Sequence, residues 1–512
     1  MDCGVIIAED EPVRLLDAVL GELNYTNLLR LYSVKGRKSK IYPSILFKII
    51  VFAMLNKKYS IRDIQKECQY NVLYMWLLEG HEAPSHMTIG RFIKRITVPV
   101  LEDLFAQFLR KLSELDSISL NEVYIDGTKL EANANRYTFV WRKNVERALA
   151  KVREQREQLY NELLEENLIN ENVDKASVLE ALATKCKKEK ITFVDGKGHH
   201  KHLLQKHFEE YESYNDRISG YEKQLAIMGT RNSYSKTDTD ATFMRMKEDH
   251  MRNGQLKAAY NLQIAVESEY IVGLGLYPNP TDTRTLMPFL NHMHDHFGIK
   301  PLYVVADAGY DSEENLAFLK AHSYLSVIKP SKYEVRKQRS YKRRIGLVEN
   351  MRYDESKDIY ICAKGRKLVF TKVRAKKNDS GYLRYTKEYQ CQNCNYCGFR
   401  CECQKTFTGE PPKNNKTLNI AETYNALQEE NMERFQSNEG IQMRINRSIQ
   451  VEGTFGLIKQ DYCYKRVLRK GKEDVYKELL FLVFGFDLRK LHMRIKGNRI
   501  GRRFLNKSEV AC

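Results

Sequence analysis

Apolar residues recur at helical spacing through most of the first 115 residues. Clear runs extend from Ile45 to Leu55, from Ile61 to Ile64 and from Val98 to Leu112, and this period is typical of amphipathic helices. Residues 1–115 are therefore predicted to form an all-α domain. Short helices joined by tight polar connections suit a helix-turn-helix-like DNA-binding domain, and a helical assembly domain is the alternative.

Short apolar runs of the kind that form strands follow this helical region. One run ends at Asp126 and another ends at Asp307, and two runs between them are separated by a short turn, as in a hairpin. The predicted strands are Val123–Ile125, Tyr260–Val266, Ile271–Leu276, Leu302–Ala306 and Tyr324–Ile328, with helices near 284–297 and 313–321. This order indicates a mixed-sheet α/β core made of residues 116–143 and 225–330.

Two insertions interrupt the predicted core. Residues 144–224 are highly charged and helical in composition, with a break near Asp195–Gly198, which predicts an antiparallel helical hairpin for interactions. Residues 331–430 combine a basic run with a group of cysteines. The last segment, residues 431–512, contains a helical stretch that opens at Glu452 and a basic carboxyl-terminal part.

Asp126, Asp307 and Glu452 together form a candidate metal site. A carboxylate at the tip of a buried strand is costly unless a positive group such as a metal ion holds it. Hard oxygen ligands favour Mg²⁺ or Mn²⁺. We expect Asp311 to cap the following helix rather than to bind metal. Asp282 is expected to start a helix, and a place lining the metal site is the alternative for it.

Three motifs surround these acids: Tyr124-Ile125-Asp126-Gly127-Thr128-Lys129, Ala306-Asp307-Ala308-Gly309-Tyr310-Asp311 and Val451-Glu452-Gly453-Thr454-Phe455-Gly456-Leu457-Ile458-Lys459. In these motifs the chain resembles the DDE transposases of bacterial insertion sequences, which belong to the RNase H-like group. The segment Ile41–Ile96 also resembles the helical domain that precedes the catalytic core in one large branch of these transposases. The resemblance extends along nearly the whole chain.

The resemblance implies an RNase H-like core in which the first and fourth strands are neighbours, so that Asp126 and Asp307 meet. It implies that both aspartates and Glu452 are catalytic and hold two divalent ions for an in-line displacement at phosphorus. Water would first free a 3′ hydroxyl at the element end, and that hydroxyl would then attack target DNA. Concerted cutting of two ends implies a homodimer or higher multimer on DNA.

Basic residues near Glu452 are candidate DNA contacts. Lys459 follows Glu452 by seven positions, which at about 100° per residue returns it to nearly the same helical face. Related transposases often carry a Tyr and an Arg before the Glu, but here Ile445 and Ser448 occupy those places. The candidate DNA-binding residues are Lys459, Arg444, Arg447, Arg466 and Arg469, and solvated surface charge is the alternative for the four arginines.

Five cysteines crowd into one short segment with the spacing C-x2-C-x2-C-x3-C-x-C: Cys391, Cys394, Cys397, Cys401 and Cys403. Four such thiolates can enclose a structural Zn²⁺ tetrahedrally. The first four also match a ferredoxin-like run, but Glu402 replaces the usual proline. Zinc is favoured over free thiols and over an iron–sulfur cluster, and Cys362 is a distant candidate partner.

The net charge of +18 and pI of about 9.2 imply a polyanionic partner. The chain starts with acidic residues where a signal peptide needs basic ones, and its longest apolar run, Leu479–Phe486, is too short to span a bilayer. Eleven cysteines, an odd number, do not suit a secreted disulfide framework. These features predict a cytoplasmic, nucleoid-associated protein that binds DNA and no membrane.

The sequence thus predicts a metal-dependent DNA transposase. Two alternatives are a transposase-derived DNA-binding protein without cleavage and an RNase H-like nuclease. The presence of all three carboxylates argues against the first, and detection of strand joining would separate the second.

Overall fold

The computed structural model describes residues 6–32, 39–116, 118–196, 200–246, 254–404 and 412–502. The chain forms two compact units. The first comprises Met1–Thr128, Asn261–Lys465 and Glu473–Cys512, and the second comprises Lys129–Tyr260 and Arg466–Lys472. The helical amino-terminal part and most of a mixed sheet belong to the first unit, so the architecture is α/β as predicted.

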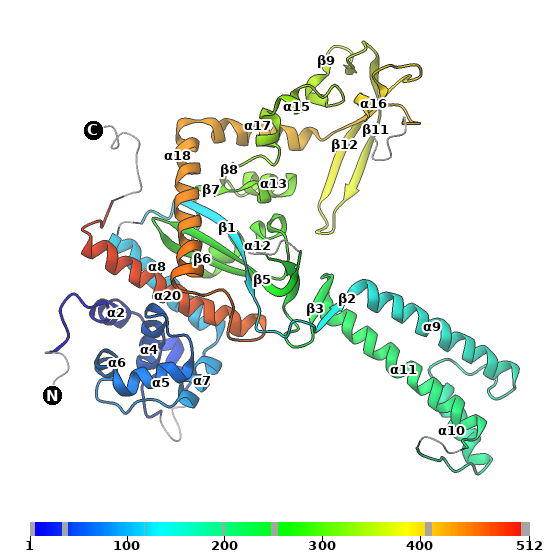
Figure 1. The fold of residues 1–512 in the computed structure, drawn as a ribbon, viewed down its shortest axis with the longest axis horizontal. Coiled ribbons are helices and arrows are strands. Elements are labelled where there is room, and N and C mark those ends of the chain that lie inside the picture. The colour runs from blue at the N-terminus through cyan, green and yellow to red at the C-terminus, as the bar shows by residue number, and fades with distance from the viewer. Residues whose placement is uncertain are drawn as a thin grey trace. The chain divides into compact units, whose positions relative to one another are not determined.

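The amino-terminal part is helical, in agreement with the apolar periodicity. Its helices are α2 (Pro12–Gly21), α3 (Thr26–Leu29), α4 (Pro43–Leu55), α5 (Ile61–Tyr70), α6 (Val72–Leu77), α7 (His86–Arg95) and α8 (Val98–Asp116) (Figure 1). Every residue of α4 except Ser44 is buried, as expected for a helix that is apolar on all sides. Its one charged residue, Lys48, pairs with Asp17 at 2.6 Å.

The main sheet is mixed. Its strands β1 (Glu122–Glu131), β5 (Leu256–Glu267), β6 (Tyr270–Tyr277), β7 (Tyr303–Ala306) and β8 (Leu325–Ile328) lie in the order β6-β5-β1-β7-β8. The β5–β6 hairpin is antiparallel, whereas β7 pairs in parallel with both β1 and β8. The predicted neighbourhood of the first strand and the strand that precedes Asp307 is therefore confirmed.

Helix α12 (Leu286–Phe297) packs on β6 and α8. Two glycines of β6 allow the close approach. A methyl group on Gly273 would lie 2.6 Å from Met293 Sδ, and one on Gly275 would lie 2.8 Å from Phe289 Cδ2. Side chains at these positions would push α12 away from the sheet, so the glycines fix its height above β6.

Glu452 lies inside a helical run rather than at its start. The run comprises α17 (Glu422–Gln436), α18 (Asn438–Arg447), the π-helical η4 (Ser448–Glu452), α19 (Gly453–Gly456) and the π-helical η5 (Leu457–Asp461). Helix continues from Asn438 to Asp461 because the residues between these segments keep helical backbone angles. The expectation that the helix opens at Glu452 is wrong, since the helix begins at Asn438.

The charged insertion belongs to the second unit, where α9 (Arg142–Glu165) and α11 (Leu203–Met228) pack along each other (Figure 1). An additional helix, α10 (Val178–Lys188), which the sequence did not predict, packs Leu182 and Cys186 against Leu163 and Tyr211. The same unit contains the antiparallel pair of β2 (Phe139–Trp141) and β3 (Ser233–Ser235), which lie on either side of the insertion in sequence, and β4 (Thr242–Arg245), which pairs with the start of β5. Of the predicted break near Asp195–Gly198, Lys197 and Gly198 lie outside the described residues.

The cysteine-rich insertion is a folded sheet. After the short helices α14 (Tyr333–Lys337) and α15 (Arg339–Lys342), five antiparallel strands lie in the order β13-β12-β11-β10-β9. They are β9 (Arg352–Asp354), β10 (Ile359–Ile361), β11 (Lys367–Lys377), β12 (Leu383–Cys391) and β13 (Thr417–Ile420). The sequence pattern predicted none of these strands.

The carboxyl-terminal helix α20 (Lys472–Lys496) is buried along most of its length. Phe484 contacts the rings of Phe47 in α4 and of Phe105 and Phe108 in α8. On another face, Asp487 Oδ1 accepts a hydrogen bond from Ile271 N at 2.9 Å. Helix α20 therefore packs between the amino-terminal helices and the β5–β6 hairpin. Across the described residues, we find no helix with the length and apolar character needed to cross a membrane.

Gly485 allows the close crossing of α20 and α4, and we expect a larger residue there to destabilise the fold. A methyl group there would lie 2.6 Å from the backbone nitrogen of Leu55, so Gly485→Ala should lower the free energy of unfolding by about 1–3 kcal/mol. Gly90→Ala is the matched control, because its methyl group would lie 3.5 Å from Ile61 Cδ1 in ordinary contact. Urea unfolding followed by circular dichroism measures both, and equal midpoints would contradict the close helix crossing.

Candidate active site

The two aspartates come together through strand pairing. In the parallel β1–β7 ladder Ile125 is aligned with Ala306, so the next residues, Asp126 and Asp307, lie on adjacent strands about 5 Å apart. Asp126 does not end its strand, because β1 continues to Glu131. Asp307 directly follows β7. Asp126 is 8% exposed, and Asp307 is partly buried.

Gly127 and Arg447 are among the partners of the Asp126 carboxylate. Its Oδ1 accepts the backbone N–H of Gly127 at 2.8 Å, and its Oδ2 lies 3.1 Å from a terminal nitrogen of Arg447. The Arg447 side chain is only 15% exposed. This pair supplies the positive charge that a buried carboxylate needs, and it ties the end of α18 to β1.

Asp307 shapes the turn that follows β7. Its side chain accepts the Gly309 N–H at 2.8 Å and caps η2 (Ala308–Tyr310). The Tyr310 ring is fully buried, and its hydroxyl donates to Gln263 Oε1. Burial, with the negative charges of Asp282, Asp126 and Asp307, holds the pKa of Tyr310 well above its usual value. The three aspartates thus act on one buried hydroxyl, which stays protonated.

Asp282 belongs to this carboxylate group, which the sequence did not favour. Its Oδ1 accepts hydrogen bonds from Asn261 Nδ2 at 2.8 Å and Gln263 Nε2 at 2.9 Å. A methyl group on Gly127 would lie 2.5 Å from the same oxygen. Asp282 also begins η1 (Asp282–Arg284), so the expected helix-start role is compatible with a place beside Asp126. The polar Asn261 and Gln263 in an otherwise apolar strand were the signal for it.

Asp311 does not cap the following helix, contrary to the expectation. Ser312 is the N-cap of α13 (Glu313–Ala321), and its hydroxyl accepts the Asn315 N–H at 3.1 Å. Asp311 Oδ2 instead accepts hydrogen bonds from Ser331 N at 2.7 Å and Tyr424 Oη at 2.9 Å. Asp311 therefore connects the loop that contains Ser331 to helix α17.

Glu452 is exposed on the helical run that Arg447 ties to β1. Hydrogen-bonded residues of a π-helix are five positions apart. Glu452, at the end of η4, follows Arg447 by five positions and so lies about one turn further along the helix. Glu452 therefore lies one turn beyond the contact with Asp126. Within the described residues, the oxygens of Glu452 and the aspartates do not form a group of three within 4.8 Å.

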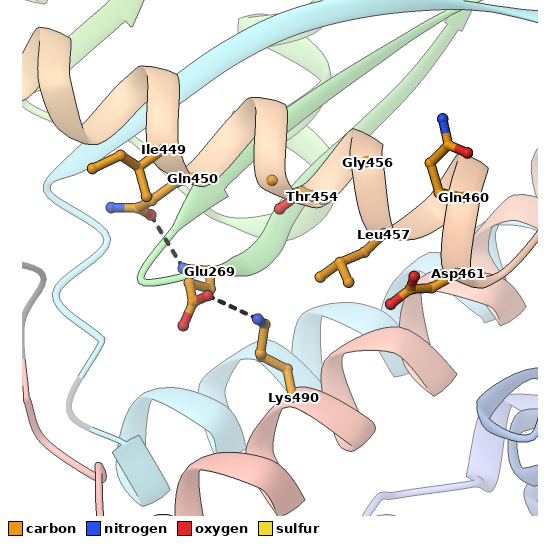
Figure 2. A pocket seen from close by; sticks show the side chains of 10 residues that line it. Glu269, Ile449, Gln450, Thr454, Gly456, Leu457, Gln460, Asp461 and Lys490 are labelled. Atoms are coloured by element: carbon orange, nitrogen blue, oxygen red, sulfur yellow. Dashed lines mark hydrogen bonds and ion pairs between the residues drawn. The ribbon is translucent and has the colours of Figure 1, made fainter.

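A pocket of about 350 Å³ lies beside this helix, lined by Glu269, Ile449, Gln450, Gly453, Thr454, Gly456, Leu457, Gln460, Asp461 and Lys490. Figure 2 shows Glu269 between Gln450 and Lys490. Gln450 Oε1 accepts the Glu269 N–H at 3.1 Å, and Lys490 Nζ lies 2.8 Å from Glu269 Oε1. These contacts hold the helix of Glu452 to the β5–β6 turn and to α20.

The predicted basic residues have different surroundings. Arg444 is partly buried with its guanidinium 4.1 Å from the Phe435 ring centre. In the second unit, Arg466 is exposed and donates to Ala134 O at 3.2 Å, and Arg469 is partly buried. Lys459 is partly buried in the π-helical η5, so a constant rotation of about 100° per residue does not describe the whole step from Glu452 to Lys459.

Only some of the cysteines lie close to one another. Cys391 and Cys394 are buried in one hydrophobic cluster, and Cys362 and Cys403 pack against it. Cys397 is partly buried and Cys401 is exposed. No three of these thiols, all within the described chain, come within 4.8 Å of one another. Burial raises the pKa of Cys391 to about 11 and also raises that of Cys403, so a bound cation would be needed to hold them as thiolates.

Comparison with known proteins gives two family matches. Residues 2–95 match the family described as "Transposase domain (DUF772)", and residues 361–492 match the family described as "Transposase DDE domain". The second match includes Glu452 and Lys459, whereas Asp126 and Asp307 precede it. No curated protein and no solved structure matches the chain. The two matches confirm the predicted resemblance: one segment of the chain is similar to an amino-terminal transposase domain and another to a transposase DDE domain, which is consistent with an insertion-sequence DDE transposase.

Proposed function

We propose that this protein cuts the ends of an insertion sequence and joins them to target DNA by divalent-metal-dependent phosphoryl transfer. The observation that carries the proposal is the parallel β1–β7 ladder, whose last paired residues, Ile125 and Ala306, directly precede Asp126 and Asp307. Glu452, inside the matched DDE domain, is the third carboxylate of the proposed site.

The order of the main sheet supports an RNase H-like catalytic core. Numbered along the chain, its strands lie as 3-2-1-4-5, with an antiparallel hairpin on one side of the first strand and two parallel strands on the other. The helical run with Glu452 follows the fifth strand after the cysteine-rich insertion. This is the arrangement that the family resemblance implies.

The donor set fits a hard divalent cation. Asp126 and Asp307 supply carboxylate oxygens, and Mg²⁺ is commonly held by one or two carboxylates together with water. Gly309 keeps the approach to Asp307 free of a side chain, since a methyl group there would lie 3.0 Å from Asp307 Oδ1. Two bound Mg²⁺ or Mn²⁺ ions would activate the attacking oxygen and stabilise the leaving oxygen.

The surrounding residues position this site. Asn261 and Gln263 donate to Asp282 and fix its carboxylate beside Gly127. Arg447 balances the charge of Asp126 and is well placed to contact a DNA phosphate when the carboxylate turns to a cation. The same proposed role in DNA binding extends to Lys459, Arg444, Arg466 and Arg469.

Recognition of the element ends is assigned to the amino-terminal helices. Helices α5 and α7 pack together, and α7 exposes Arg91 and Lys94. A helix that presents basic side chains in this way suits the major groove. Two ends must be cut and joined in concert, so the active form is proposed to be a homodimer or higher multimer on nucleoid DNA.

Two other functions would use the same core. A transposase-derived DNA-binding protein would bind the ends without cutting them, and an RNase H-like nuclease would cut without joining. Incubation with labelled end DNA and a target plasmid separates the three, because only the transposase yields joined products.

Asp126→Asn, Asp307→Asn and Glu452→Gln should each lower magnesium-dependent cleavage roughly 10³-fold, since the metals supply several kcal/mol of stabilisation in the transition state. Binding of end DNA should change little, because the amides keep the size of the side chains. Nicking and gel-shift assays in parallel measure both effects. Glu433→Gln, an exposed carboxylate on α17, is the control, and near-normal cleavage by one of the three variants would remove that residue from the site.

Arg91→Ala combined with Lys94→Ala should weaken binding to end DNA and reduce its preference over scrambled DNA. The slope of log affinity against log salt should fall by about 1–2 because up to two phosphate contacts are lost. The full chain is required, since the α4 core packs against α20. Lys187→Ala with Lys188→Ala, exposed on α10, removes equal charge as the control. Unchanged preference would make the amino-terminal helices an assembly domain.

The cysteine cluster is proposed to hold a structural zinc through Cys391, Cys394 and Cys403 with Cys362 or Cys397. Cys391→Ser combined with Cys394→Ser should remove about one tightly bound Zn²⁺ per chain. Elemental analysis after dialysis measures the loss, and Cys463→Ser, at an exposed cysteine outside the cluster, should retain the metal. Iron with visible absorption would indicate a cluster instead, and a metal-free wild-type protein would indicate plain thiols.

A further inference from the structure

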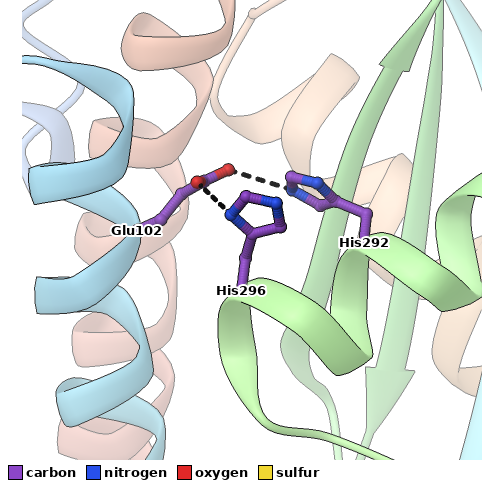
Figure 3. Close-up of side chains that lie close together, drawn as sticks. All are labelled: Glu102, His292 and His296. Atoms are coloured by element: carbon purple, nitrogen blue, oxygen red, sulfur yellow. Dashed lines mark ion pairs between the residues drawn. The ribbon is translucent and has the colours of Figure 1, made fainter.

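A second group of metal-ligating side chains lies outside the proposed catalytic site. Glu102 projects from α8, and His292 and His296 project from α12 toward it (Figure 3). The histidines are four positions apart and therefore share one face of α12. Leu286, at the start of α12, adjoins η1 and Asp282, and His296 lies ten residues further along, roughly 15 Å along the helix axis.

The three side chains converge through their ligating atoms. Glu102 Oε1 lies 3.0 Å from His292 Nε2, and Glu102 Oε2 lies 2.8 Å from His296 Nδ1. One ligand atom from each residue lies within 4.8 Å of the other two. Ligands of a tetrahedral zinc lie roughly 3.3 Å apart, so only small outward shifts would admit an ion.

The burial of Glu102 demands a positive partner. Its side chain is 2% exposed, and the contacts described for it are with His292, His296 and Tyr476. A carboxylate removed from water is costly unless a positive charge compensates it. A cation held by all three side chains would supply that charge, because imidazole nitrogens and carboxylate oxygens both offer lone pairs to it.

We propose that Glu102, His292 and His296 bind a divalent transition metal, with zinc the best match to two imidazoles and one carboxylate. Three protein ligands leave one position for water, and the 45% exposed His296 side chain gives access from solvent. Tyr476 Oη lies 2.8 Å from the same nitrogen, His292 Nε2, so this contact would open when Nε2 takes the ion, and the hydroxyl would keep its hydrogen bond with Glu102.

The proposed ion would join two elements that are far apart in sequence. Helix α8 leads into β1, and α12 packs on β6 close to its glycines. Phe105 of α8 already contacts Phe297 of α12 edge to face. A metal between Glu102 and the two histidines would lock this helix pair and so stabilise the sheet that carries Asp126.

The test uses the full chain, stripped of metal and then titrated with Co²⁺ and, separately, Zn²⁺ in excess Mg²⁺, which occupies the carboxylate site. A site of nitrogen and oxygen ligands should give weak visible Co²⁺ absorption without the intense near-ultraviolet sulfur band of the cysteine cluster. His292→Ala with His296→Ala should remove this signal and weaken Zn²⁺ binding roughly 100-fold. Zn²⁺ should raise the Tm of the wild-type protein.

His294→Ala is the matched control, because His294 lies on the same helix with an exposed side chain and contacts Asp295. This variant should keep the signal and the Tm shift. If the double variant does not fold, the single variant His296→Ala tests the same site, because this side chain is half-exposed and its loss should be tolerated. Equal Co²⁺ spectra and Tm shifts in wild type and His296→Ala, or no nitrogen-type signal in the wild type, would overturn the proposal and leave a carboxylate–histidine ion pair.

Discussion

The parallel pairing of β1 with β7 is the interaction on which the candidate active site depends. The ladder aligns Ile125 with Ala306, and a shift of one residue would turn every side chain of one strand to the opposite face. Asp126 and Asp307 would then lie on opposite faces of the sheet. The apolar residues before each aspartate, buried on both sides of the sheet, fix this register because a slip would expose or misplace them.

Helix α20 explains why the two ends of the chain belong to one unit. Its Phe484 contacts aromatic rings of both α4 and α8, and Gly485 permits backbone contact with Leu55. The same helix binds the β5–β6 turn through Asp487 and Lys490. The first matched segment thus depends on a helix from the other end of the sequence, so the amino-terminal helices and the main sheet are coupled through a shared interior.

The sequence predicted the strand order and the meeting of the two aspartates, because apolar runs and turns are local signals and the resemblance supplied the pairing. It missed what depends on tertiary contacts. Asp282 was expected to start a helix and does so, but only the fold reveals that Asn261 and Gln263 hold it beside Gly127. The π-helical turns that contain Glu452 and Lys459 were not predicted, because such turns have no signature in apolar spacing. The second sheet was missed because β11 is largely exposed and basic, without a clear alternation.

Arg447 links the charge of Asp126 to the position of Glu452. Both side chains of the pair are largely buried, and removing one partner of such a pair typically costs about 3–5 kcal/mol because the other charge is left uncompensated. Loss of either partner would therefore weaken the contact between α18 and β1, and Glu452 follows this contact by five residues in the π-helical η4. If cations come to balance Asp126, the guanidinium loses its main partner and becomes available to phosphate. Neutralisation of Asp126 by cations would then be coupled, through Arg447, to the position of Glu452.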